Sequence, residues 1–263
     1  MKNIFYKGLL CILLLCYFQS CKKKTEQLKS EESTSILKND TNFTSIFDGK
    51  TLNNWKGDPT YWRVENGCLV GEVTPETILK RNTFIIWQGD KPANFELKLE
   101  YKISATGNSG INYRSELITE TPFALRGYQA DIDGKNRYTG QNYEEKKRTT
   151  LAYRGEKVIL ENNNNIVDLK SNIKNNCWQI RDVVESLGQS DSLKINIKNN
   201  DWNQVHLIIK GNRLKHYVND ILMSDVIDND SINRNLSGYL GVQVHTGPPM
   251  KVEYRNIKLK NLN

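Results

Sequence analysis

Three short segments carry polar side chains of fixed hydrogen-bonding geometry at every second position. Because a strand points residues i, i+2 and i+4 to one side, each segment would present these groups on one face. Carboxylates and imidazoles can move protons, and a guanidinium can stabilise a developing negative charge. If the three strands are neighbours, they form the floor of a concave polar groove suited to a sugar. The sets are Asn112, Arg114 and Glu116; Gln129, Asp131 and Asp133; and Gln243 and His245.

An ordinary solvated sheet face is the competing interpretation, because alternation alone does not distinguish it from a groove. The opposite faces of the same segments are apolar, as Ile111 and Tyr113 show, and would pack into a core. Solvated faces are usually rich in Lys, Thr, Ser and Glu. The amides, carboxylates and imidazole found here therefore favour the groove.

His245 precedes Thr-Gly-Pro-Pro, a rigid turn that would hold its strand end in place. His206 and His216 lie in alternating segments without a polar cluster nearby, and we interpret both as structural. The chain has no HExxH or CxxC motif, so a structural zinc site is not expected. Glu116 and Asp131 could hold a hard divalent cation, but no other residue supports such a site and no cofactor is required.

The stretch Gln129-Ala-Asp131-Ile-Asp133 invites comparison with retaining β-glucanases, which carry Glu-x-Asp-x-x-Glu on one strand. Retaining hydrolysis needs two carboxyls about 5–5.5 Å apart. Two aspartates two residues apart on a strand could lie only slightly farther apart. The spacing leaves a conventional glycosidase open, whereas an amide at the leading position argues against ordinary double displacement.

The elements that would position these residues are strands. Residues 95–103 alternate apolar and polar side chains, which predicts a strand with one buried face. Asn66-Gly67 predicts a tight hairpin between two short strands, and further strands are expected at 205–210, 213–218, 221–226 and 251–259. Residues 190–198 predict a short helix with Ser190 or Asp191 as N-cap. The expected fold is an all-β antiparallel β-sandwich, or concanavalin-like jelly roll, with one short helix.

The N-terminus has the layout of an export signal. Two lysines, a short apolar run and Ser20-Cys21 indicate a lipoprotein-type signal peptide at residues 1–20 and lipidation of Cys21. Residues 21–42 would form the acylated cysteine and a flexible tether, and residues 43–263 a single carbohydrate-active domain. The protein would then be anchored to a bacterial membrane by its lipid, facing the periplasm or the cell surface. A plain signal peptide cut nearby is the alternative.

Charge and cysteine content exclude other classes. The chain has 37 basic and 30 acidic residues, and removal of residues 1–20 leaves a formal charge of +5 that is spread along the sequence. Nucleic acid is not an expected partner, because its binding needs a basic stripe on the folded body. Cys68 and Cys177 are the cysteines outside the leader and could form one disulfide or remain free thiols.

The body resembles the 3-keto-disaccharide hydrolase domain family. Segments that carry the resemblance include residues 47–55, 62–67, 127–133 and 241–252, the last with the motif Gly-Val-Gln-Val-His-Thr-Gly-Pro-Pro. They occur in the expected order over nearly the whole body. The resemblance implies a concanavalin-like jelly roll that acts on glycosides whose sugar was oxidised at C3 by a partner oxidoreductase.

A ketone at C3 acidifies the proton on C2, so the glycosidic oxygen can leave from C1 by β-elimination, and water can then add. This route needs a base, an enolate stabiliser and an acid, but no carboxylate nucleophile, which agrees with Gln129. Our hypothesis makes His245 or Asp131 the base, Arg114 the stabiliser and Glu116 the acid. The residues expected to contact substrate or form the groove wall are Asn112, Gln129, Asp133, Gln243, Tyr143 and Arg148. A non-catalytic carbohydrate-binding module and a conventional glycoside hydrolase remain the alternatives.

Overall fold

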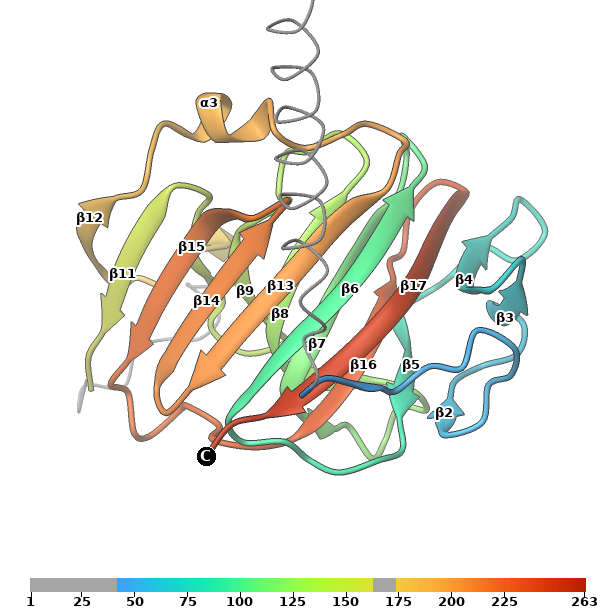
Figure 1. Cartoon of the computed structure of the whole chain (residues 1–263). Coiled ribbons are helices and arrows are strands. Elements are labelled where there is room, and N and C mark those ends of the chain that lie inside the picture. Colours follow the sequence, from blue (N-terminus) through green and yellow to red (C-terminus); the bar gives the residue numbers. More distant parts are fainter. Residues whose placement is uncertain (1–41, 163–173) are drawn as a thin grey trace, which may run out of the picture. The chain divides into compact units, whose positions relative to one another are not determined.

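The computed structural model describes residues 42–162 and 174–263 of the chain. Phe43–Asn263 form one compact unit built from two facing β-sheets (Figure 1). The predicted signal peptide at residues 1–20, lipidation at Cys21 and the tether up to residue 41 lie outside the described residues. Within the described ranges, no helix is both long enough and apolar enough to cross a membrane.

The larger sheet has ten strands in the order β12-β11-β15-β14-β13-β6-β17-β4-β3, with β1 paired to β17. Its pairs are antiparallel except for the parallel pair of β11 and β15. The strands are β1 (Thr44–Ser45), β3 (Trp62–Glu65), β4 (Cys68–Val73), β6 (Phe95–Ile103), β11 (Glu156–Leu160), β12 (Asp182–Ser186), β13 (Asn203–Lys210), β14 (Arg213–Val218), β15 (Ile221–Asp228) and β17 (Met250–Asn261).

The smaller sheet has seven strands in the order β10-β9-β8-β7-β16-β5-β2, and all of its pairs are antiparallel. Its strands are β2 (Trp55–Lys56), β5 (Thr83–Trp87), β7 (Asn108–Leu117), β8 (Leu125–Asp133), β9 (Asn142–Glu145), β10 (Thr149–Ala152) and β16 (Tyr239–Val244). Two packed, mostly antiparallel sheets confirm the predicted β-sandwich of the jelly-roll type.

Local sequence signals explain the hairpins. Asn66 and Gly67 have φ angles of 50° and 78°, the left-handed conformation that a tight hairpin turn between β3 and β4 requires. Gly211, with φ of 57°, plays the same part between β13 and β14. β6 alternates buried and half-buried residues along its whole length, as the pattern at residues 95–103 predicts.

The core lies between the two sheets and includes stacked and edge-on aromatic rings. Tyr113 of β7 stacks on Tyr128 of β8 with ring centroids 5.5 Å apart. The Tyr113 hydroxyl also lies 2.8 Å from Nε2 of His216, a buried residue of the larger sheet. Burial lowers the pKa of His216 to about 3, so this imidazole is neutral and braces the two sheets.

Two local predictions are settled here. The helix α3 spans Ser190–Lys194, shorter than predicted, and its N-cap is Gln189, so the prediction of Ser190 or Asp191 is wrong. Gln189 has an extended backbone and makes no side-chain capping bond, so the helix starts one residue earlier than the polar pattern predicts. Cys68 and Cys177 are free thiols, which decides between the two alternatives left open by the sequence.

Candidate active site on the outer face of the seven-stranded sheet

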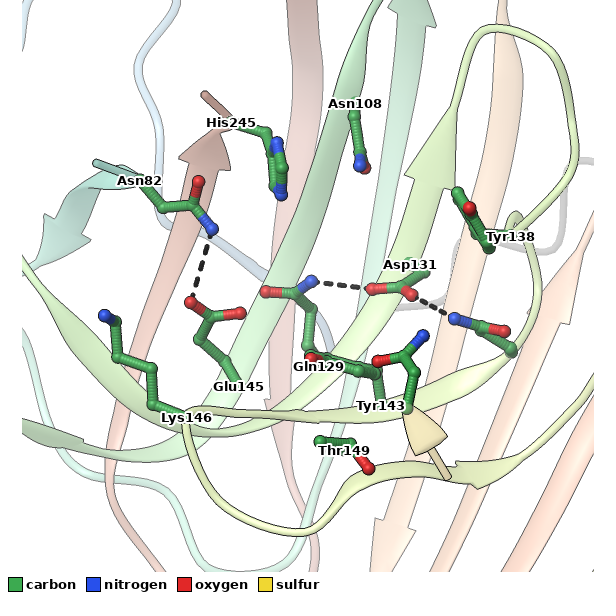
Figure 2. A pocket seen from close by; sticks show the side chains of 12 residues that line it. Asn82, Asn108, Gln129, Asp131, Tyr138, Tyr143, Glu145, Lys146, Thr149 and His245 are labelled. Atoms are coloured by element: carbon green, nitrogen blue, oxygen red, sulfur yellow. Dashed lines mark hydrogen bonds between the residues drawn. The ribbon is translucent and has the colours of Figure 1, made fainter. Parts of the chain in front are cut away.

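A polar pocket of about 460 Å³ opens on the face of the smaller sheet that points away from the larger sheet (Figure 2). Its volume lies in the range of small-ligand sites, roughly 300–1,000 Å³. Two carboxyls, an imidazole and several amides converge in it. The lining residues are Asn82, Asn108, Gln129, Asp131, Tyr138, Gln141, Tyr143, Glu145, Lys146, Thr149, Asn176 and His245.

Strand register brings these side chains together. On the neighbouring strands β7, β8 and β9, Gly110 lies opposite Asp131 and Gln129 lies opposite Tyr143. His245 follows the last residue of β16, the strand on the other side of β7. Since alternate residues of a strand share a face, Gln129 and Asp131 point into the pocket while Tyr128 points into the core.

Asp131 is held by two amides. Gln129 Nε2 donates to its Oδ1 at 2.6 Å, and Gln141 Nε2 donates to its Oδ2 at 2.5 Å (Figure 2). Burial raises the pKa of Asp131 to about 7, although both amide bonds favour the ionised form. A Cβ at Gly110 would lie 2.3 Å from Cδ of Gln129, so only glycine there lets the Gln129 side chain lie flat over β7. Asp131 is therefore a fixed carboxyl that can change protonation near neutral pH.

Glu145 is the second carboxyl of the pocket, and it is 6% exposed. Burial raises its pKa, whereas the amide of Asn82 and the charges of Lys146 and His245 lower it. Asn82 Nδ2 donates to Oε1 of Glu145 at 3.3 Å. The buried carboxyl is thus held by amide donors, Asn82 from the opposite wall of the pocket and Gln243 from the floor, and both favour its ionised form.

His245 projects from the end of β16 toward the centre of the pocket (Figure 2). Its Nδ1 lies 2.5 Å from the carbonyl oxygen of Thr246. Because a carbonyl only accepts, this contact requires the proton on Nδ1 and leaves Nε2 with a free lone pair in the neutral ring. The structure therefore presents His245 as a proton acceptor.

Arg114 does not reach this pocket, which corrects the expected convergence with His245. Its backbone has a φ of 45°, and the β7–β8 register shifts between Tyr113 and Glu116. This bulge breaks the alternation on which the prediction depended. The buried guanidinium instead donates to the carbonyl oxygens of Ala93 and Gly211 at 2.9 and 2.8 Å.

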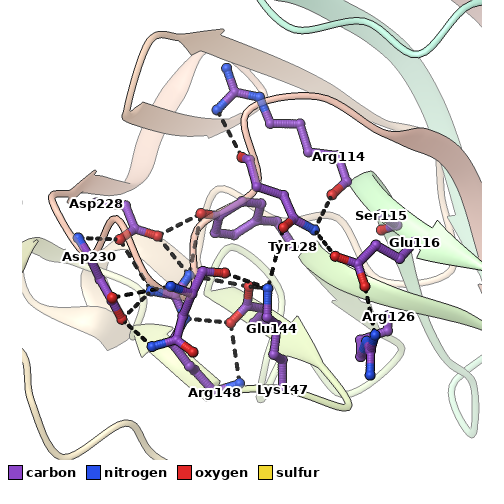
Figure 3. A network of polar contacts seen from close by, with 12 residues as sticks. Arg114, Ser115, Glu116, Arg126, Tyr128, Glu144, Lys147, Arg148, Asp228 and Asp230 are labelled. Atoms are coloured by element: carbon purple, nitrogen blue, oxygen red, sulfur yellow. Dashed lines mark hydrogen bonds and ion pairs between the residues drawn. The ribbon is translucent and has the colours of Figure 1, made fainter. Parts of the chain in front are cut away.

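Glu116 and Arg148 also lie outside the pocket, in the network of Figure 3. The Glu116 side chain is 44% exposed and pairs with Arg126 at 2.6 Å. Arg148 is buried, and its partners are the carboxylates of Glu144, Asp228 and Asp230. It does not form the groove wall directly. It anchors the β9–β10 hairpin, and other side chains of that hairpin line the pocket.

Three further predicted residues lie at or beneath the floor. Gln243 is buried, and its Nε2 donates to Oε1 of Gln129 at 3.3 Å. It therefore holds in place the glutamine that donates to Asp131. Asn112 is fully buried, and neither of its amide atoms has a partner. The carboxylate of Asp133 accepts the backbone N–H groups of residues 137–139 and organises the loop that carries Tyr138. None of the three lines the cavity.

Of the residues predicted from sequence, the pocket gathers Gln129, Asp131, Tyr143 and His245. Glu145 is not among the predicted residues, although it lies two residues after Tyr143 and strand alternation places both on one face. Two further lining residues that were not predicted, Asn108 and Thr149, begin the strands β7 and β10. The remaining ones come from loops and offer no periodic signal: they are Asn82, Tyr138, Gln141, Lys146 and Asn176.

A cation shared by Glu116 and Asp131 finds no support in this geometry. The two carboxyls have different partners, Arg126 for one and a pair of glutamine amides for the other. Among the residues that the structure describes, no group of three His, Cys, Asp or Glu side chains could hold a metal ion. The pocket does contain two carboxyls whose pKa is raised by burial, and they lie beside an imidazole. Carboxyls and imidazoles are groups that can accept and donate protons.

The two packed sheets define a jelly-roll β-sandwich domain with a polar pocket on one sheet face. The fold is shared with crystal structures of two candidate glycosyl hydrolases from Parabacteroides distasonis, each with a TM-score of 0.51. The first is 21% identical and the alignment covers 85% of this chain and 95% of that one. The second is 16% identical, with 84% and 99% covered.

The chain belongs to the 3-keto-alpha-glucoside-1,2-lyase-like domain family, whose profile matches residues 42–260. This confirms the resemblance found in the sequence. A curated relative from Bacteroides thetaiotaomicron, the 3-keto-disaccharide hydrolase, is 33% identical over 147 aligned residues, and the match covers 45% of this chain and 50% of the relative. The chain spans about half the length of that relative.

Proposed function

We propose that this protein cleaves glycosides whose sugar carries a ketone at C3, by proton abstraction at C2 and departure of the glycosidic oxygen from C1. The observation that carries the proposal is the convergence of His245, Asp131 and Glu145 from three strands in one pocket. Family membership and the name of the Bacteroides relative support the same substrate class.

His245 is the base in this scheme. Its Nδ1 proton is engaged by the Thr246 carbonyl, so the lone pair on Nε2 is free to accept the C2 proton. A C2–H bond next to a ketone is acidic enough for an imidazole to remove its proton when the resulting enolate is stabilised.

Asp131 stabilises the enolate in place of Arg114. Below its pKa of about 7 the carboxyl is protonated and can donate a hydrogen bond to the C3 oxygen as charge develops there. Neutral buried acids stabilise enolates in this way elsewhere. Gln129 and Gln141 hold the group in position without needing its proton, because both donate to it.

Glu145 is the acid in place of Glu116. It gives its proton to the leaving oxygen as the C1–O bond breaks, which yields an enone and an alcohol. Water can then add to C1 with Glu145 as base, while the His245 imidazolium returns a proton to C2. This second half restores both residues, and the net reaction is hydrolysis without a covalent intermediate.

The test is incubation of the full chain with a synthetic 3-keto-glucoside in deuterium oxide, followed by NMR. Wild-type protein should release a sugar carrying deuterium at C2 faster than an enzyme-free control exchanges that position. His245→Ala and Glu145→Gln should each lower kcat by about 10²–10⁴-fold. Cleavage of the unoxidised glucoside, or release of a sugar that keeps its C2 proton, would favour a conventional glycosidase. Binding without turnover would identify a carbohydrate-binding module.

We also propose export and lipid attachment at Cys21, and supply of the substrate by an oxidoreductase that converts the C3 hydroxyl to a ketone. The support is the charged, apolar and Ser-Cys order of the leader, and the chemistry of the substrate itself. Incorporation of labelled palmitate into wild-type protein but not into Cys21→Ser protein tests the anchor.

A further inference from the structure

Asn82 links the two sides of the pocket, although nothing in its sequence context singles it out. It immediately precedes β5, and the antiparallel register places Thr83 opposite Val244. The next pair along the ladder is Asn82 and His245, whose side chains share the pocket face. The residue is therefore the cross-strand neighbour of the proposed base.

The hydrogen bonds of Asn82 determine which way its amide points. The backbone N–H of Thr246 donates to Oδ1 at 3.0 Å, and the Thr246 hydroxyl lies 3.4 Å from the same oxygen. A backbone N–H can only donate, so its partner must be the amide oxygen. The amide nitrogen is then directed at Glu145 Oε1, 3.3 Å away (Figure 2).

We propose that Asn82 is a positioning residue that holds the acid Glu145 against the strand end that carries the base His245, through this one oriented amide. The roles of Glu145 as acid and His245 as base rest on the proposed function, whereas the hydrogen bonds of Asn82 do not depend on it. Asn82 bridges β9 and the residue after His245, so a change at position 82 alters both catalytic groups together.

The same amide also influences the protonation of Glu145. The charged or titratable groups around this carboxyl are Lys146 on its own hairpin, His245 after β16, and Asp131 and Tyr143 on the pocket floor and wall. The N–H of Asn82 favours the ionised carboxylate and opposes the effect of burial on its pKa. Replacing this donor by an acceptor would reverse that contribution.

Asn82→Asp is the decisive variant. The new carboxylate still accepts the Thr246 N–H, so the fold is retained, but it faces Glu145 with a like charge. Asn108→Asp is the matched control, because Asn108 lines the same pocket without bonding to Glu145. The measurement is NMR titration of the Glu145 side-chain carboxyl carbon in the free protein, which needs no substrate.

We expect Asn82→Asp to raise the Glu145 pKa by one unit or more, and Asn108→Asp to raise it by less than half as much. Equal shifts in the two variants, or no shift in either, would overturn the proposal. With a 3-keto-glucoside, Asn82→Asp should lower kcat at least tenfold, leave KM within about threefold and move the alkaline limb of the pH profile upward. If wild-type protein does not cleave that substrate, the proposed function fails while the titration still decides the role of Asn82.

Discussion

Replacing the carboxyl of Asp131 by an amide should change how the stability of this protein depends on pH. In the folded protein the Asp131 pKa is raised by burial to about 7, whereas in the unfolded chain it should have its ordinary value of 3.8. Between these values the native state keeps a proton that the unfolded state has lost. The free energy of unfolding therefore falls as pH rises through this window, and the loss is complete above the folded-state pKa.

The size of the effect follows from the shift. A difference of about 3 pKa units corresponds to about 4 kcal/mol at about 1.4 kcal/mol per unit. Between about pH 5 and about pH 8 the wild type should lose about 2.5 kcal/mol through this group. The amide of the Asp131→Asn variant cannot ionise, so the variant keeps that stability at high pH, whatever constant cost the amide adds beside Gln129 and Gln141.

The assay is urea unfolding of both proteins at several values of pH, with the difference in unfolding free energy plotted against pH. Subtraction cancels the other titrating groups, provided that they are unaffected. Glu116→Gln is the control, because hydrogen bonds from Arg126 and Asn235 lower the pKa of Glu116 and keep it ionised throughout this range. A wild-type minus Asp131→Asn difference that does not vary with pH would refute the assignment of Asp131 as the group with a raised pKa.

Three further outcomes are expected. Arg114→Met should lower the unfolding free energy by about 3 kcal/mol in urea titrations, because buried carbonyls lose a charged donor. A large loss of kcat in a variant that keeps the wild-type unfolding free energy would contradict the structural role of Arg114. Thr149→Gly should raise the thermal midpoint and stabilise by about 1 kcal/mol, since Thr149 has a φ of 66° that a β-branched residue rarely adopts. Glu116→Gln should leave kcat unchanged and cost less than about 1 kcal/mol, because its ion pair is exposed; a hundredfold loss of activity would restore Glu116 as the acid.

Part of the site could be predicted because it depends on local geometry. Gln129 and Asp131 share a face by strand alternation alone, and the structure places both in the pocket. Arg114 shows where this reasoning fails. A bulge with a left-handed φ interrupts β7 at that residue, and the alternating pattern does not predict this bulge.

Local steric preferences depend on neighbouring residues alone. The sequence by itself therefore determines the strands, the Asn66-Gly67 hairpin and the polar face of β8. Strand order is a nonlocal outcome of packing two sheets around one core, and no short-range pattern records it. Asn82 therefore lies beside His245, and Glu145 lies across the pocket from both, only because of the tertiary structure. These residues meet through strand pairs that are far apart in the chain.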